Sequence, residues 1–283
     1  MRGRSKLVGV GVLLAVVAGL GITLIVKAPP AFLKQAQPAF ASFSSPPPSG
    51  PYVTRTLPVR FCVNTAIAGC ATSLSDGTAP KPNPLPSVST YEPVSMVCWQ
   101  DGSNFTGPYT TNRWFWIKSQ SGKVGFISAS VVPVNRQTKV PACSTNKSIV
   151  AVETAVERYG QRTASSADRA LFANSEWAPG PVGEWSGDCV KLPYVAWHAA
   201  GVPILKNNAL ANYNYYHGKG LVKGGTPPVG AVVWFNIDRP LGHEAIYVGD
   251  GLTASTLGVD GNNKPNVVKP YTSWGSYLGW WLP

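Results

Sequence analysis

The pattern of apolar and polar positions divides the chain into four stretches, of which the first is an apolar run. Residues 7–26 carry no charge, and a basic lead (residues 1–6) precedes them. At about 1.5 Å per residue, such a run is long enough to cross the apolar core of a bilayer. We expect a cytoplasmic lead and a transmembrane anchor over residues 1–27, with the bulk outside, because the positive flank is amino-terminal. A cleaved signal peptide, which would make the protein secreted, is the alternative.

A spacer and a β-rich stretch follow the apolar run. Residues 28–50 are rich in Pro, Ala and Ser, which is typical of a semi-extended linker. Residues 51–144 then show short β-type runs separated by turn residues. Runs at this spacing predict a small barrel or sandwich.

The last stretch, residues 145–283, changes from helical to strand patterns. Apolar residues recur at helical spacing after residue 148 and again over 190–200. Residues 212–218 have the composition of a polar-aromatic loop, and strands are expected at 231–235, 244–248 and 251–256. Helices followed by strands predict an α+β domain. The expected fold class is therefore α+β, with a transmembrane helix and a small all-β domain in front.

The charge balance bears on the partners. Lys and Arg number 24 against 13 Asp and Glu, which gives a formal net charge of +11. The basic residues are scattered, apart from those at the amino terminus, so nothing resembles a nucleic-acid-binding arm. The excess fits attraction to an anionic surface such as a cell-wall polymer, and solubility alone is the alternative.

Five cysteines divide unevenly over the chain. Four lie in the first half and can pair if the protein is exported, which leaves one over in the second half. Three connectivities are possible. We favour Cys62–Cys70, which closes a short local loop, and Cys98–Cys143, which ties the end of the β-rich stretch to its middle. With no C-x-x-C pattern and only three histidines, a structural zinc site is not expected, and no other cofactor is implied.

The remaining cysteine and a distant histidine form the candidate catalytic pair. Cys189 follows a glycine-containing turn where a helical pattern begins, so backbone N–H groups at a helix start would stabilise a thiolate. His243 precedes an apolar β-branched run that ends in Gly-Asp-Gly. A thiol nucleophile needs a base of this kind to accept its proton. A buried core cysteine and a packed histidine are the ordinary alternatives.

Two family resemblances add to this interpretation. Leu-Pro-Val-Arg at 57–60, Cys-Trp-Gln-Asp-Gly at 98–102 and Gly-Phe-Ile-Ser at 125–128 resemble a bacterial SH3-like domain over residues 51–144. Such domains often bind wall peptides through aromatic residues, and the matching ones here are Trp99, Trp114 and Trp116, although packing in a core is the commoner use of aromatics.

The second resemblance covers roughly residues 150–257. The Gly-His-x-x-Ile-Tyr-x-Gly-x-Gly pattern at 242–251, placed after Asp-Cys at 188–189, resembles the NlpC family of cell-wall peptidases and the related CHAP amidases. It implies a compact papain-like fold over residues 145–283, with Cys189 as nucleophile and His243 as general base.

Three further residues take their expected roles from this resemblance or from flanking the cysteine. Ser255 matches the third, histidine-orienting position, where the family more often has His, Asn or Gln, and a serine would stabilise an imidazolium less well. Trp185 and Asp188 flank the nucleophile and would shape a substrate groove. A packing aromatic and a helix cap are their alternatives. Glu244 would reach the histidine only if the strand were irregular.

The resemblance implies an extracytoplasmic cysteine peptidase or amidase that cuts amide bonds in peptidoglycan stem peptides. The alternative from another class is a catalytically weak wall-binding or scaffolding protein, in which Ser255 marks the decay of the site. A transferase that resolves the same acyl-enzyme with an amine is a third possibility.

Overall fold

The computed structural model describes residues 48–64, 70, 86–158, 167, 170–171, 189–237, 241–255, 268–270 and 275–283. The chain forms two compact units, Met1–Pro46 and Pro47–Pro283. The first unit, and with it the expected membrane helix and most of the expected linker, lies outside the described residues. All of the described residues belong to the second unit.

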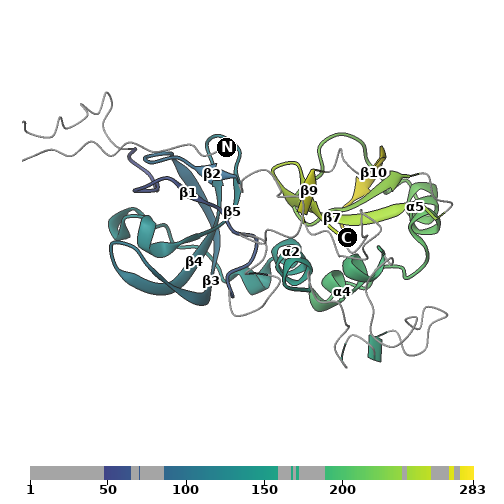
Figure 1. The fold of residues 1–283 in the computed structure, drawn as a ribbon, viewed down its shortest axis with the longest axis horizontal. Helices are drawn as coiled ribbons and strands as arrows, with labels where there is room; N and C mark the ends of the chain where they lie inside the picture. The colour runs from purple at the N-terminus through teal and green to yellow at the C-terminus, as the bar shows by residue number, and fades with distance from the viewer. Residues whose placement is uncertain are drawn as a thin grey trace, which may run out of the picture. The chain divides into compact units, whose positions relative to one another are not determined.

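Two small antiparallel sheets form the first part of this unit (Figure 1). One pairs β1 (Leu57–Pro58) with β2 (Ser87–Val88). The other has the order β3-β4-β5, with bounds Val94–Thr106, Thr110–Ser119 and Val124–Ser128. Three short 3₁₀ helices follow, at Ala129–Val131, Val134–Arg136 and Cys143–Thr145. The expected short strands are therefore present, while the likeness to an SH3-like domain stays a prediction.

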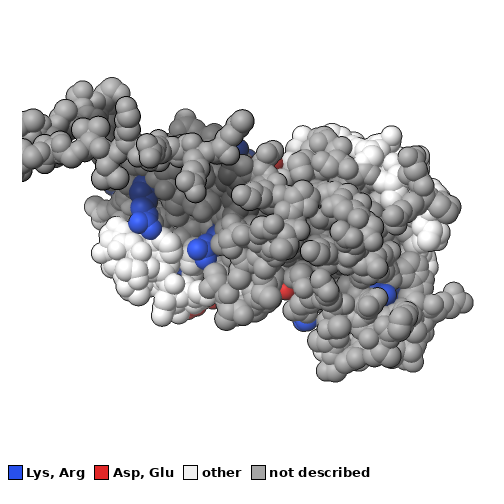
Figure 2. Space-filling model, viewed as in Figure 1, with Lys and Arg blue, Asp and Glu red and all other residues white. Residues whose placement is uncertain are grey.

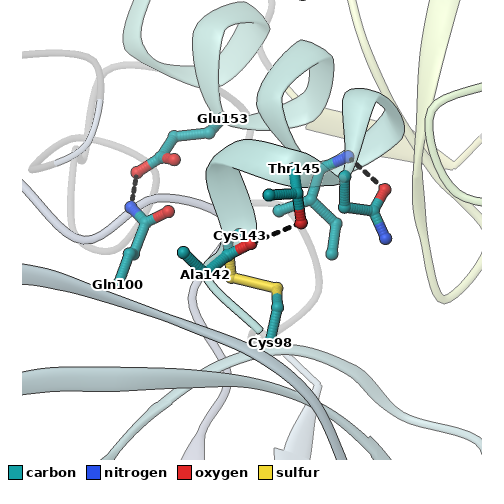
Figure 3. The surroundings of a disulfide bond; sticks show 8 residues. Cys98, Gln100, Ala142, Cys143, Thr145 and Glu153 are labelled. Atoms are coloured by element: carbon teal, nitrogen blue, oxygen red, sulfur yellow. Dashed lines mark hydrogen bonds between the residues drawn. A yellow bond between two sulfur atoms is a disulfide. The ribbon is translucent and has the colours of Figure 1, made fainter. Parts of the chain in front are cut away.

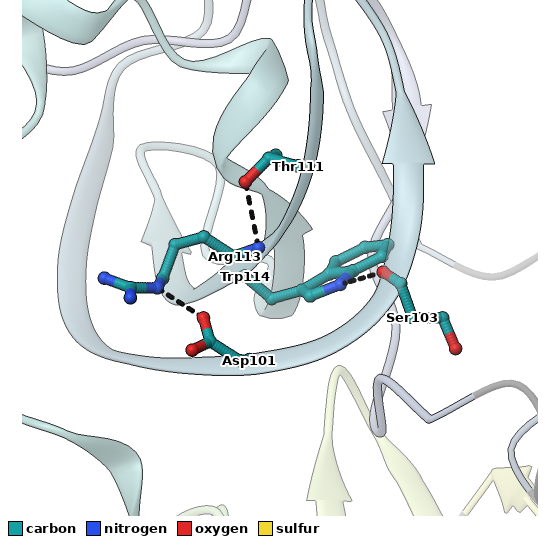
Figure 4. Close-up of polar contacts among 5 residues, drawn as sticks. All are labelled: Asp101, Ser103, Thr111, Arg113 and Trp114. Atoms are coloured by element: carbon teal, nitrogen blue, oxygen red, sulfur yellow. Dashed lines mark hydrogen bonds and ion pairs between the residues drawn. The ribbon is translucent and has the colours of Figure 1, made fainter.

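The central strand β4 is buried on both faces. Phe115 and Ile117 pack in an apolar cluster within the β-rich part. Trp114 and Trp116 point the other way and share a cluster with the helices. Their side chains are 2% and 3% exposed, and the indole N–H of Trp114 donates to the carbonyl of Ser103 at 2.9 Å (Figure 4). These two tryptophans therefore pack in the core and do not line a surface groove.

The third tryptophan of the expected groove, Trp99, is covered by the side chain of Arg113. The Arg113 guanidinium lies over the Trp99 ring, 3.7 Å from its centroid. Nε of Arg113 donates to Oδ1 of Asp101, its partner across β3 and β4, at 2.6 Å, which holds the guanidinium in place (Figure 4). A ligand would have to displace this pair before it could stack on the indole.

Two disulfide bonds tie the β-rich part together, and they join the pairs favoured above. One links Cys62 to Cys70 and the other links Cys98 in β3 to Cys143 in the third 3₁₀ helix (Figure 3). The second bond lies just before the helix that opens the next part of the chain, so it fixes the start of that helix against β3.

Breaking Cys98–Cys143 is expected to cost more stability than breaking Cys62–Cys70. The two bonds span 45 and 8 residues, and loop-closure entropy gives about 4 kcal/mol for the longer loop and about 2.5 kcal/mol for the shorter one. Urea unfolding of the two double cysteine-to-alanine variants measures both losses. An equal loss, or a larger one for the short loop, would contradict this expectation.

Three helices whose bounds lie within the described residues and a five-stranded antiparallel sheet form the described core of the second part (Figure 1). The helices are α2 (Lys147–Arg158), α4 (Lys191–Ala199) and α5 (Ala209–Gly218). The sheet has the order β10-β6-β7-β8-β9. Its strands in chain order are Val232–Asn236, His243–Gly249, Leu252–Ala254, Val268–Pro270 and Ser276–Trp281. The helix α5 replaces the loop expected at 212–218.

The two faces of this sheet are distinct because side chains alternate along each strand. Residues Val232, Trp234, Ile246 and Val248 share an apolar cluster with residues of α2 and α4. The alternating set forms a separate cluster without residues of the three helices, made of Ala231, Val233, Phe235, Ala245 and Tyr247. We call these the helix face and the outer face of the sheet.

The expected fold class is corrected by these observations. The described part of the chain has more residues in strands than in its three bounded helices, and none of these helices is long and apolar enough to cross a membrane. The transmembrane helix, and the membrane as a partner through it, are therefore not part of the described fold. The apolar pattern at residues 7–26, on which that expectation rested, lies outside the described residues.

A buried carboxyl joins α2 to β3. Glu153 accepts a hydrogen bond from Nε2 of Gln100 (Figure 3). Burial and, to a smaller extent, the nearby Glu157 carboxyl raise the pKa of Glu153 to about 7, against hydrogen bonds from Gln100 and the Val63 backbone that act to lower it. Burial also raises the pKa of Glu157, against the effect of Arg158. Negative charge at this contact is therefore disfavoured at neutral pH.

Replacing Glu153 by Gln is expected to stabilise the fold at about pH 8 and to change little near pH 4.5. The folded-state pKa lies above its ordinary value of 4.5. The wild type therefore loses stability as the pH rises from about 4.5 to about 7, by about 3 kcal/mol at most. Urea unfolding at both pH values measures the difference. A Gln variant no more stable than the wild type at the higher pH would contradict this.

Glu92 is a matched control, because its pKa is shifted in the opposite direction. Burial acts to raise the pKa of Glu92, but hydrogen bonds from Ser121, Ser89 and Ser119 outweigh burial and lower it to about 2. Its charged form therefore stabilises the fold above pH 4.5, and that stability is lost as the pH falls towards 2. Glu92→Gln should be less stable than the wild type at about pH 8.

Candidate active site

Cys189 lies just before helix α4 and outside both disulfides. It is partly buried and packs against the apolar cluster of the helix face. Helix α4 starts at Lys191, with Val190 as its cap residue and no side-chain capping bond. Pro193 therefore falls in the first turn, where an N–H has no partner within the helix, and so its ring is compatible with the helix.

His243 is the first residue of β7 and is fully buried. Gly242 before it has a φ of +68°, a left-handed conformation that favours glycine. His243 pairs with Phe235 across the strands, and the centroids of the two rings are 6.0 Å apart. Because Phe235 belongs to the outer face, the imidazole lies on the outer face as well.

Ser255 follows β8 by one residue and is fully buried. Ala254 pairs with Ile246 on the helix face, so alternation directs Ser255 to the same side as His243. Its hydroxyl donates to the backbone carbonyl of Glu244 at 3.4 Å. The structure therefore brings Ser255 and His243 to one face on neighbouring strands.

Glu244 points to the opposite face from His243. Its Oε2 accepts hydrogen bonds from Nδ2 of Asn212 at 3.0 Å and from Nε1 of Trp234 at 2.9 Å. The register of β6 and β7 is regular here, with a shift in β7 only later, between Tyr247 and Gly249. Sequence reasoning did not identify this network. An acidic residue within an otherwise apolar strand was the available signal.

The direction of α4 relates the cysteine to the histidine. α4 contacts β7, and the indole N–H of Trp197, near the end of α4, donates to the carbonyl of Gly230 at 3.1 Å. Gly230 in turn donates to Tyr247 at 2.8 Å, near the far end of β7. Cys189 precedes Trp197 by about 12 Å of helix rise, and His243 precedes Tyr247 by about 13 Å of strand. A helix that runs in the same direction as β7 would bring Cys189 level with His243.

Two of the expected site residues are not described. Trp185 and Asp188 lie outside the described residues, so their roles in a substrate groove stay predictions. In the described ranges, no group of three His, Cys, Asp or Glu side chains is arranged to hold a metal ion. The residues available for chemistry are a thiol before a helix, an imidazole at the start of a strand, and a hydroxyl that follows the neighbouring strand and donates to the Glu244 backbone.

Comparison with solved structures finds several neighbours, including the two described below. No family model and no curated protein matches the chain. NlpC2 from Trichomonas vaginalis is similar over 82% of this chain and 72% of its own, with 14% identity and a TM-score of 0.35. An NlpC/P60 family protein from Bacillus cereus ATCC 10987 is similar over 82% of this chain and 63% of its own, with 15% identity and a TM-score of 0.34. At these values the function has to be argued from the residues.

Proposed function

We propose that this protein is an extracytoplasmic cysteine peptidase or amidase that cuts amide bonds in peptidoglycan stem peptides. One observation carries the proposal. The one cysteine outside the two disulfides, Cys189, precedes a helix that packs on the strand opened by the buried His243. Two disulfides support an oxidising compartment outside the cytoplasm.

The chemistry proposed for these residues is acyl transfer through a thioester. His243 accepts the thiol proton of Cys189, and the thiolate sulfur bonds to the carbonyl carbon of the scissile amide. The C–N bond then breaks, and the imidazolium gives its proton to the departing amine. Water, deprotonated by the same imidazole, hydrolyses the thioester and restores the thiol. The Ser255 hydroxyl, which donates to the backbone carbonyl of Glu244, would help to hold the strand that carries the imidazole.

The substrate class rests on the sequence motifs and on charge. The 242–251 pattern resembles that of cell-wall peptidases, and the chain carries a net charge of +11. On the face shown in Figure 2, the coloured Lys and Arg atoms cover more surface than the Asp and Glu atoms. A basic protein is attracted to anionic wall polymers, which raises the rate of encounter with their stem peptides.

One observation favours the second candidate, a wall-binding protein without activity. The imidazole lies on the outer face of the sheet, whereas Cys189 packs with the helix-face cluster. Two side chains on opposite faces of a sheet can approach each other only past the edge or the end of a strand. His243 is the first residue of β7, so the thiol would have to reach the imidazole at the amino-terminal end of that strand.

Digestion of purified peptidoglycan by the full chain distinguishes the two candidates. The proposed enzyme releases soluble peptides with new amino and carboxyl termini, which mass spectrometry identifies together with the bond cut. A protein that sediments with the wall and releases no peptide would support the second candidate and contradict the first.

A further inference from the structure

Glu244 is a buried carboxyl in an apolar setting. Its side chain has no exposed surface, and its Oε2 accepts hydrogen bonds from Asn212 in α5 and Trp234 in β6. The flanking positions on the same face, Ile246 in β7 and Val232 in β6, are apolar. An apolar side chain would fill this position without the large cost of removing a carboxyl from water. The carboxyl therefore needs a reason other than packing.

Strand register supplies that reason. Trp234 pairs with Glu244 across β6 and β7, and Phe235 pairs with His243. A shift of one residue would move every side chain of β7 to the other face. Glu244 would then lose both of its donors, and the imidazole would leave Phe235 for the helices. A buried polar contact of this kind excludes the shifted register, as a single polar residue does in coiled coils.

The same contact ties the start of β7 to α5. Asn212 also accepts a hydrogen bond from the Asn207 backbone at 3.2 Å, so its side chain is itself fixed. On the other side of His243, the Leu210 N–H donates to the carbonyl of Leu241 at 2.9 Å. The backbone of His243 is thus held to α5 on both sides, although it follows a glycine.

We propose that Glu244 is a positioning residue for His243. Through Asn212 and Trp234 it fixes the register of β7, and so it sets the face and the position of the imidazole that the proposed function uses as its base. Glu244 does not touch the reacting atoms. Its side chain lies on the helix face and the imidazole lies on the outer face, so Glu244 affects the ring only through the register of the strand that carries both residues.

Two variants and a control test this inference. Glu244→Leu keeps the bulk of the side chain and removes both hydrogen bonds, whereas Glu244→Gln keeps an acceptor oxygen. Ile246→Val removes one methylene group from the same face of the same strand and touches no polar contact. The first readout is the nuclear Overhauser effect between the rings of His243 and Phe235. The second is the rate of Cys189 alkylation by iodoacetamide at about pH 7.

We expect Glu244→Leu to weaken or lose the ring-to-ring effect and to slow alkylation by up to about 30-fold, because an ordinary thiol with a pKa of about 8.5 is only about 3% thiolate at about pH 7. Glu244→Gln should retain most of both, and Ile246→Val should retain both. If Glu244→Leu does not fold, Trp234→Phe removes only one donor N–H and should show a smaller change in the same direction. Unchanged readouts in the folded variants, or equal losses in Ile246→Val, would overturn the inference.

The inference and the proposed function fail in different ways. If the wild-type thiol reacts no faster than an ordinary cysteine, the proposed function fails. The ring-to-ring effect still reports whether Glu244 positions His243 in that case. If the wild-type thiol is activated and Glu244→Leu changes neither readout, the positioning role fails and the proposed function stands.

Discussion

Replacing Cys189 by alanine is expected to abolish the release of peptides from purified peptidoglycan. The thiol sulfur forms the bond to the substrate in the proposed mechanism, and alanine has no atom to replace it, so the rate should fall by about 10⁴-fold or more. Cys189 is only partly buried and takes part in neither disulfide. The variant should therefore keep its fold. Mass spectrometry of released peptides measures the activity, and thermal unfolding measures the fold.

Val190→Ala is the matched control for this experiment. Val190 is the neighbouring residue and is fully buried, so its truncation should lower stability by about 1–3 kcal/mol while the thiol stays in place. We expect this variant to release peptides at a temperature below its unfolding transition. Release at the wild-type rate by the folded Cys189→Ala protein would rule out the proposed mechanism.

Replacing His243 by glutamine is expected to lower kcat by about 10³-fold with little change in KM. Glutamine fills much of the buried space of the imidazole and can form hydrogen bonds, but it does not accept and return a proton at neutral pH. The thiol and the substrate contacts remain in this variant, so the fall in kcat measures the contribution of the general base alone. Steady-state kinetics on a synthetic stem peptide give both constants.

Ser255→Ala serves as the comparison for His243→Gln. The hydroxyl donates to the Glu244 backbone carbonyl at 3.4 Å and is uncharged, so it contributes weakly to the stability of an imidazolium. A loss of about tenfold or less is expected. A loss as large as that of His243→Gln would show instead that Ser255 is essential to the reaction, and it would contradict a minor role for this hydroxyl.

The sheet that carries His243 could be predicted because its signals are local. Apolar, β-branched runs and glycine turns predicted strands at 231–235 and 244–248, and the structure has Val232–Asn236 and His243–Gly249. The helical pattern at 190–200 likewise corresponds to Lys191–Ala199. In each case the pattern depends on neighbours within a few residues.

Helix α5 could not be predicted in the same way. Its buried residues, Ala209, Asn212 and Tyr216, do not form a clear apolar stripe, so its composition indicated a loop. One local signal was present, because the Asn208 side chain caps the helix by accepting from the Ala211 N–H. The role of Asn212 depends on Glu244, which lies 32 residues away. Contacts at that separation follow from tertiary packing and leave no periodic trace.

The face on which each site residue lies also needed the structure. Alternation alone separates His243 from Glu244, but it does not say which of the two faces the helices. The contacts of Trp234 with Glu244, and of Phe235 with His243, decide it. Sequence reasoning considered Glu244 only as a partner of the imidazole. In the structure its side chain lies on the helix face and accepts hydrogen bonds from Asn212 and Trp234 instead.

The most direct test of the central claim is the pH dependence of Cys189 alkylation in the wild type and in His243→Gln. Iodoacetamide reacts with the thiolate, and an ordinary cysteine reaches half of its maximal rate at about pH 8.5. The account predicts that the wild-type midpoint lies well below this value and that the His243→Gln midpoint returns to it. Identical curves for the two proteins would show that the imidazole does not act on the thiol, and would contradict the account.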